Sequence, residues 1–258
     1  QYYNMAEPSL QLGNGNWAGK SGNLLAYHKA NNNFYADELT FTRASTGTIV
    51  NAEGLIESVA SGIPRVDYLN NTNGSLLLEP QRTNLILNSE PTANEGATSG
   101  GIVYQSFDWG VIGFTTCVYY SSNFYRYAGS CVANTEYTIS VFIKMDDSSS
   151  PIVGTNTSLG DFSFILSGSV VANAAIIEDF GSNVYRVSVK STSGATNLNN
   201  NGLIQFNTQS LKKFRVVGWQ LEQGSYPTSY IPTSGTTVTR LAKKRIRKRY
   251  KFYIVETV

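Results

Sequence analysis

The recurrence of an apolar side chain at every second position over residues 136–144 constrains the fold more than any other feature of this sequence. The apolar positions are Tyr137, Ile139, Val141 and Ile143. Side chains of an extended strand point alternately to opposite faces, so the segment predicts a β-strand with one wholly apolar face. Such a face is stable only when a second layer covers it.

Comparable short segments recur along the chain, separated by Asn, Gly and Ser residues that favour turns. We expect further strands at residues 39–43, 48–50, 55–58, 65–68, 75–78, 113–120, 123–127, 161–166, 174–179, 184–189, 202–206 and 214–221. No helix signal is longer than a turn or two, and no window approaches the ~20 apolar residues of a membrane span. The sequence therefore predicts an all-β protein without a membrane partner, an antiparallel β-sandwich of jelly-roll type with a preceding hairpin-rich segment.

Composition changes divide the chain into four parts. Residues 1–23 are rich in Asn, Gly and Gln and are interpreted as an N-terminal arm or linker. Residues 24–87 form the hairpin-rich segment, which we expect to pack on the sandwich of residues 88–240. Residues 241–258 form a basic C-terminal extension.

The C-terminal end carries a concentrated positive charge. Eight of the 20 basic residues lie between Arg240 and Lys251, which leaves 12 basic against 17 acidic residues before them. Such a tail could bind nucleic acid, pair with an acidic neighbouring protein, or form an edge strand. Since the sequence shows no nucleic-acid-binding fold elsewhere, we favour attachment or oligomer contacts. We assign these contacts to Trp17, the one tryptophan of the N-terminal arm, and to six basic residues of the tail: Lys243, Lys244, Arg245, Arg247, Lys248 and Arg249.

Residue sets that carry catalytic or metal chemistry are scarce. His28 is the only histidine, so nucleophilic triads and His-rich zinc sites lack their usual components. Phosphate-binding and dinucleotide-binding glycine motifs do not occur after a strand. Asp146, Asp147 and Asp161 could hold calcium, although we favour a solvated loop. We therefore expect no catalytic residue, no metal ion and no cofactor.

Glycoside hydrolysis remains the enzyme class worth testing, because two carboxylates suffice for it. We favour instead a structural role in which Glu79, Asp67 and Glu222 pair with arginines such as Arg65 and Arg82. Such pairs would fix the hairpin segment against the sandwich. The full set of candidate carboxylates is Glu79, Asp67, Glu136, Glu178, Asp179 and Glu222.

Sugar binding makes demands that the aromatic stretch at residues 104–127 can meet. Aromatic faces stack on pyranose rings, and neighbouring amides and guanidinium groups bond to hydroxyls. Adjacent tyrosines in a strand point to opposite faces, so at least one of them leaves the core. The alternative is that these rings pack between the sheets or at a subunit interface. The glycan-binding candidates are Trp109, Tyr119, Tyr120, Tyr125, Asn123 and Arg126.

Two sets of motifs bracket residues 39–240. The first contains TRAST, GLI, PRVDY and LLLEPQRTNL, and the second contains GWQLEQGSYPTSYIPT followed by VTR. This arrangement resembles a module of phage virion proteins, found in head and tail fibres and related appendages. The strand order across the second half is similar to that of carbohydrate-binding modules.

The resemblance implies a head or tail fibre or decoration protein of the virion, assembled in the bacterial cytoplasm. It further implies a homo-oligomer, often a trimer, that contacts other virion proteins and host surface glycans. A purely structural protein without glycan binding is the main alternative, and a polysaccharide-cleaving enzyme is a lesser one. Cys117 and Cys131 flank an expected hairpin that could bring them together. In a reducing cytoplasm we favour free, partly buried thiols.

Overall fold

The computed structural model describes residues 24–28, 34–38, 40–91, 102–120, 125–128, 130–156, 159–194, 201–206, 212–242 and 244–246. Every regular element in these ranges is a β-strand, which confirms the predicted all-β sandwich. No helix in the described part of the chain has the length and apolar character needed to cross a membrane.

Two sheets form the sandwich. The larger is antiparallel and has the strand order β16 (Ile176–Asp179), β17 (Tyr185–Thr192), β12 (Glu136–Met145), β19 (Phe214–Gln223), β10 (Thr116–Tyr120) and β9 (Ile102–Ser106). The smaller has the order β11 (Tyr125–Ala128), β18 (Asn201–Phe206), β14 (Phe162–Leu166) and β13 (Val153–Gly154), with β15 (Ser169–Val170) on β14. The pair of β13 and β14 is parallel, an exception to the expected antiparallel order.

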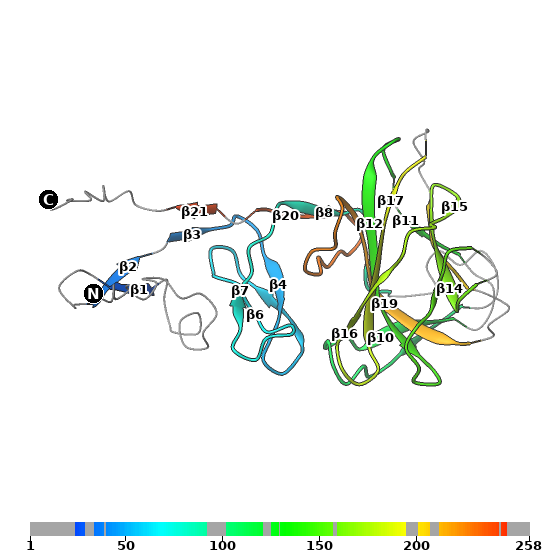
Figure 1. Ribbon diagram of the computed structural model, residues 1–258, viewed down its shortest axis with the longest axis horizontal. Helices are drawn as coiled ribbons and strands as arrows, with labels where there is room; N and C mark the ends of the chain where they lie inside the picture. The colour runs from blue at the N-terminus through cyan, green and yellow to red at the C-terminus, as the bar shows by residue number, and fades with distance from the viewer. Residues whose placement is uncertain are drawn as a thin grey trace, which may run out of the picture.

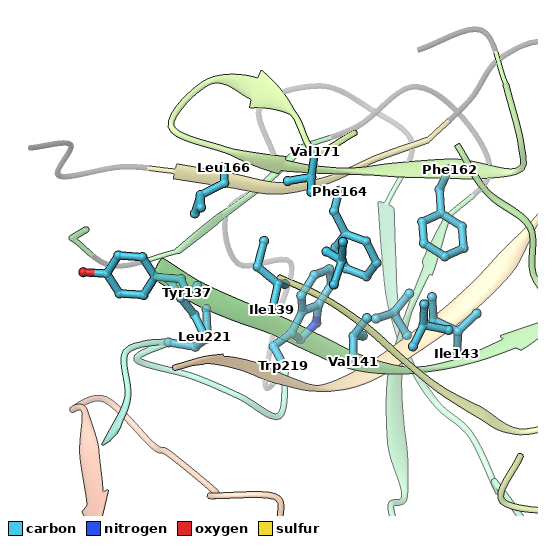
Figure 2. Packing of buried hydrophobic residues seen from close by; sticks show 14 of the residues in the cluster. Tyr137, Ile139, Val141, Ile143, Phe162, Phe164, Leu166, Val171, Trp219 and Leu221 are labelled. Carbon is cyan, nitrogen blue, oxygen red and sulfur yellow. The ribbon is translucent and has the colours of Figure 1, made fainter. Parts of the chain in front are cut away.

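The inner faces of the two sheets enclose the main core (Figure 2). Alternate residues of β12 point toward Phe162, Phe164 and Leu166 of the opposite sheet, and Trp219 of β19 lies between them. The alternation at residues 136–144 therefore has the predicted consequence. The buried members from β12 are Tyr137, Ile139, Val141, Ile143 and Met145.

The outer face of the six-stranded sheet is also covered. Phe142 of β12 and Val217 of β19 point to this side, where they pack with Trp109, Phe114 and Tyr230 in a second cluster. Phe114 and Phe142 lie 5.7 Å apart between ring centroids, and Phe114 meets Tyr230 edge to face at 5.3 Å. The six-stranded sheet is thus a wall between two apolar clusters.

Short hairpins lie beside the sandwich (Figure 1). They consist of β4 (Gly47–Val50) with β5 (Ile56–Val59) and β6 (Val66–Asp67) with β7 (Ser75–Leu76). Two further pairs join distant parts of the sequence: β8 (Arg82–Asn84) pairs with β20 (Val238–Arg240) next to the sandwich, and β3 (Thr40–Thr42) pairs with β21 (Lys244–Ile246) farther from it (Figure 1). The hairpin of β1 (Leu24–His28) and β2 (Phe34–Glu38) lies on the side away from the sandwich (Figure 1).

One predicted hairpin is wrong. Strands β10 and β11 were expected to face each other, but β10 pairs with β9 and β19, whereas β11 pairs with β18 of the other sheet. Cys117 belongs to the outer cluster and Cys131 to the inner core, so the six-stranded sheet separates them. Both thiols are free and buried, as favoured from the sequence.

A β-bulge in β19 changes which of its residues face each cluster. Ser140 pairs with Gln220, but Phe142 pairs with Val217, so two residues of β19 stand opposite Val141. Gly218 occupies the bulge with a φ of 65°, a conformation that glycine adopts without cost. The extra residue shifts the alternation, so Val216 and Trp219 both face the inner core.

We expect Gly218→Ala to lower the free energy of unfolding by about 2–5 kcal/mol, because positive φ and steric overlap both oppose a side chain there. An added Cβ would lie 2.6 Å from Cδ2 of Phe142. The matched control is Gly168→Ala, which shares a positive φ of 75° but has open space around its Cβ position. Chemical denaturation of both variants measures the difference, and equal losses would contradict the steric role of Gly218.

Candidate functional site

The carboxylate of Glu79 joins three segments that are far apart in sequence. Arg65 Nη1 donates to Glu79 Oε2 at 2.7 Å, and Arg240 Nη1 lies 3.1 Å from the same oxygen. The amide of Ser229 donates to Glu79 Oε1 at 2.6 Å, and its hydroxyl to Oε2 at 2.8 Å. Both arginine side chains are buried. The predicted role of Glu79 as a structural partner of Arg65 is confirmed.

Asn84 makes a second junction, between β8 and the motif that contains β19. Its Nδ2 donates to the carbonyls of Trp219 and Ile231, each at 2.9 Å. Its Oδ1 accepts from the amides of Leu221 and Ile86, each at 3.1 Å. The buried side-chain amide thereby satisfies both its donors and its acceptor.

The other two motif carboxylates accept hydrogen bonds from backbone amides and from a hydroxyl group. Glu222 accepts hydrogen bonds from the amide and the hydroxyl of Thr228. Asp67 accepts from the amides of Val50 at 2.8 Å and Leu69 at 3.0 Å. Neither forms an ion pair with a described arginine, so the pairing predicted for them with arginines is wrong, although both groups do fix the backbone.

The aromatic glycan-binding candidates do not form one surface. Trp109 is 0% exposed, its Nε1 donates to the carbonyl of Thr116 at 2.9 Å, and Phe107 packs on it edge to face. This burial contradicts the prediction that Trp109 stacks on a sugar. The loop before β10 folds the indole under the outer face of the sheet, because burying an aromatic ring with its N–H satisfied is strongly favourable.

Tyr119 is partly exposed at the end of β10, but its neighbours already use it. Its hydroxyl donates to Asp146 at 2.7 Å, and the guanidinium group of Arg215 lies 4.9 Å from its ring centre. Arg215 also lies 4.6 Å from the ring centre of Phe107 and forms an ion pair with Asp146. A sugar would have to displace Arg215 to stack on Tyr119.

The remaining sequence candidates are only partly described. Tyr120 ends β10, Tyr125 and Arg126 lie in β11, and their side chains are outside the described part of the structure, as is Asn123. Lys244 and Arg245 lie in β21, which pairs with β3. The other attachment candidates also fall outside the described residues: Trp17, Lys243, Arg247, Lys248 and Arg249.

The aspartates considered for calcium have separate partners. Asp146 pairs with Arg215, and Asp147 with Lys212 at 3.1 Å. Asp161 accepts from the amide of Ile152 at 2.8 Å. Among the described residues, no group of three or more His, Cys, Asp or Glu side chains is placed to hold a metal ion.

A cleft of about 180 Å³ opens where the hairpins β4 to β7 meet the outer face of the six-stranded sheet. Its apolar lining includes Phe142, Phe180 and Tyr230. Phe180 is half-buried and meets Phe142 edge to face, with 5.1 Å between ring centroids. A cleft that combines aromatic walls with a few converging polar groups is the usual form of a small-ligand site.

Arg186 of β17 is the most unusual polar group in this cleft. It is 7% exposed, and its Nη2 donates to the Thr228 carbonyl at 2.6 Å and to Ser140 Oγ at 3.1 Å. Its Nε is buried without a hydrogen-bond partner, and its guanidinium group lies 5.6 Å from the Phe142 ring centre. Burial lowers the pKa of Arg186, although the charges of Glu222 and Glu178 oppose this shift.

Arg186 and Phe180 were not predicted from the sequence as site residues, and Glu178 was predicted only as one of the candidate catalytic carboxylates. A signal was present, because the turn at Gly181 to Asn183 predicts a hairpin in which Glu178 faces Arg186. The sequence could not indicate that hairpins distant in the chain would cover Glu178 and Arg186.

Two solved structures show the kind of protein that this chain is similar to. A scan against protein-family models finds no match, and neither does a search of curated proteins. The chain is similar to the CBM22-1–GH10 modules of Clostridium thermocellum xylanase 10B complexed with xylohexaose, at 13% identity and a TM-score of 0.36, over 57% of this chain and 30% of that one. It is also similar to a structure described as family 16 carbohydrate binding module-2, at 17% identity and a TM-score of 0.33, over 54% and 99% of the two chains.

We expect Glu79→Gln to lower the free energy of unfolding by about 3–5 kcal/mol at pH 7, because it leaves two buried arginines without their anion. Burial alone would raise the pKa of Glu79, but Arg240, the Ser229 amide and Arg65 outweigh it and hold this pKa below its usual value. Its stabilising contribution is therefore complete above about pH 4.5 and is lost as the pH falls through the lowered pKa.

Denaturation of the parent and of Glu79→Gln between pH 3 and pH 7 measures this contribution. The difference between the two proteins is expected to shrink at the acidic end. Glu57→Gln, an exposed change on β5, is the control and is expected to leave the pH profile unchanged. Parallel profiles for the parent and Glu79→Gln would contradict the role of the charge.

Proposed function

We propose that this chain is a non-catalytic, glycan-binding β-sandwich of a phage virion appendage, with the cleft beside Arg186 as its sugar site. The cleft carries the proposal because it joins three features that sugar recognition needs. The half-buried ring of Phe180 offers apolar surface, Glu178 offers a hydrogen-bond acceptor, and Arg186 offers donors.

The commitments of the motif carboxylates support a non-catalytic role. A glycoside hydrolase needs one carboxyl group to donate a proton and a second to attack or to activate water. Glu79 is bonded to two guanidinium groups, and Glu222 to Thr228. Carboxylates held in this way stabilise the fold and are poorly placed to exchange protons with a substrate.

The virion assignment is supported by the motifs and by their positions. The two motif sets, which bracket the chain, lie side by side through Glu79, Asn84 and Arg240. Their polar residues therefore define one structural unit, in which hairpins at the start of the module lock onto its last strands. A homo-oligomeric appendage of such units would bind a glycan surface multivalently, which raises the effective affinity by roughly 10²–10⁴.

A purely structural virion protein is the second candidate. It is favoured by one observation, namely that Glu79 and Asn84 of the motifs direct their hydrogen bonds into an internal network that joins the hairpins to the sandwich. In that case the sandwich would act as a spacer or a capsid cement and would bind no glycan.

We expect the purified chain to bind surface polysaccharides of its host on a glycan array, and Phe180→Ala to weaken this binding at least tenfold. Phe180 lines the cleft and is only half-buried, so the variant is expected to remain folded. The control is Tyr226→Ala, an exposed ring that packs on Arg82 outside the cleft. Absence of any glycan signal would favour the structural candidate, and equal binding by both variants would move the site elsewhere.

We also expect immunogold electron microscopy of intact phage particles to locate the chain on a head or tail appendage. The label is expected at several symmetry-related positions, because multivalent attachment requires several copies. Particles from a phage lacking the gene are the control. A label that is absent from purified particles would overturn the virion assignment while leaving the cleft untouched.

A further inference from the structure

Arg186 differs from the other buried arginines in how its charge is balanced. Arg65 and Arg240 share the carboxylate of Glu79. Arg43 has no carboxylate partner, but its guanidinium group donates hydrogen bonds to four backbone carbonyls, those of Ser45, Val59, Ala60 and Ile63. Among the described residues, Arg186 has neither arrangement, since no carboxylate lies within ion-pair distance and only Nη2 donates.

An unpaired buried guanidinium group is costly, because burial removes water without supplying an anion. Arg186 is 7% exposed and lines the cleft, so an anion placed in the cleft would reach it. The two hydrogen bonds of Nη2 fix the orientation of the group, and its Nε has no acceptor. The site therefore holds a preoriented cation that a ligand can neutralise.

The carboxylates around the cleft are not equally available to Arg186. Glu79 is bonded to two arginines, and Asp67 accepts two backbone amides. Glu178 is different, because it forms no hydrogen bond with the described residues and faces Arg186 across the strand pair β16 and β17. It remains a free acceptor at the edge of the cleft.

Resting on the glycan-binding function proposed above, we propose that the cleft selects an acidic sugar unit, whose carboxylate pairs with Arg186 and whose hydroxyl donates to Glu178. Each requirement comes from a different group. Arg186 can pair with an anion, Glu178 can accept a hydrogen bond from a hydroxyl group, and the ring of Phe180 can pack against the C–H groups of a sugar ring. A uronic acid or a comparable carboxylate-bearing sugar supplies all three on one ring.

Other ligand classes satisfy the site less well. A neutral sugar supplies the donor and the apolar surface but leaves the charge of Arg186 unpaired. Inorganic phosphate pairs with Arg186, yet it meets the negative charge of Glu178 and offers no surface to Phe180. The acidic sugar is therefore the class that the combination of Arg186, Glu178 and Phe180 favours.

Matched polymer pairs test this selectivity on the whole chain. Polyglucuronate, polygalacturonate and polymannuronate are each compared with their carboxyl-reduced forms, which differ only in carrying a primary alcohol in place of the carboxylate. Calorimetry is expected to show at least one acidic polymer that binds ten or more times more tightly than its reduced form. Equal binding within every pair, or no binding to any acidic polymer, would overturn the proposal.

Variants separate the charge of Arg186 from its packing. Arg186→Gln is expected to remove the preference for the acidic polymer, and Arg186→Lys to restore part of it. Glu178→Gln, which removes the opposing charge, is expected to strengthen acidic binding several-fold. If Arg186→Gln does not fold by circular dichroism, Glu178→Gln and the polymer pairs decide the question on folded protein.

The same measurements distinguish failure of this inference from failure of the proposed function. Binding of neutral glycans that depends on Phe180 but not on Arg186 would leave glycan binding in place and overturn the acidic selectivity. Loss of all glycan binding on the array would overturn both.

Discussion

The arrangement of the hairpins against the sandwich depends on the ion pairs and hydrogen bonds of the Glu79 carboxylate. This carboxylate neutralises Arg65 from the hairpins and Arg240 from β20, and it holds Ser229 from the loop after β19. Gly47 of β4 passes so close that an added Cβ would lie 3.2 Å from both arginine side chains. Charge, hydrogen bonding and backbone contact thus converge at one point. Two buried cations around one anion are tolerable only while that anion stays ionised.

The hairpins that Glu79 fixes cover one face of the six-stranded sheet. Its inner face is committed to the opposite sheet, and its outer face carries Phe142 and Val217, which would be exposed apolar surface without a cover. The bulge at Gly218 shifts the alternation of β19, so that Val216 and Trp219 face the inner core while Val217 faces this side. The hairpins that Glu79 helps to fix cover this outer face incompletely. The cleft is the space that remains between the hairpins and the outer face of the sheet.

Local pattern predicted much of the fold, whereas the site depended on contacts that pattern does not encode. Alternation located β12, β14, β17 and β19 because each has an apolar inner face. The pairings of β8 with β20 and of β3 with β21 were not predicted, since short strands joined across the chain carry no periodic signal.

Aromatic content had a similar weakness as a guide to the site. The sequence could identify Trp109 as a ring suited to stacking, but its burial depends on a loop closing onto the carbonyl of Thr116. Arg186 was hidden for the opposite reason, because a single cation between Tyr185 and Val187 has the pattern of an ordinary solvent-facing strand residue. Arg186 becomes a buried charge only because the hairpins cover this part of β17. Glu79 and Asn84 hold the hairpins in place without any contact to Arg186. The fold can therefore tolerate the unpaired charge of Arg186 in the cleft. A guanidinium group already oriented by Ser140 and Thr228 loses little further freedom when an anion binds, and the free energy of the new ion pair is then available for recognition.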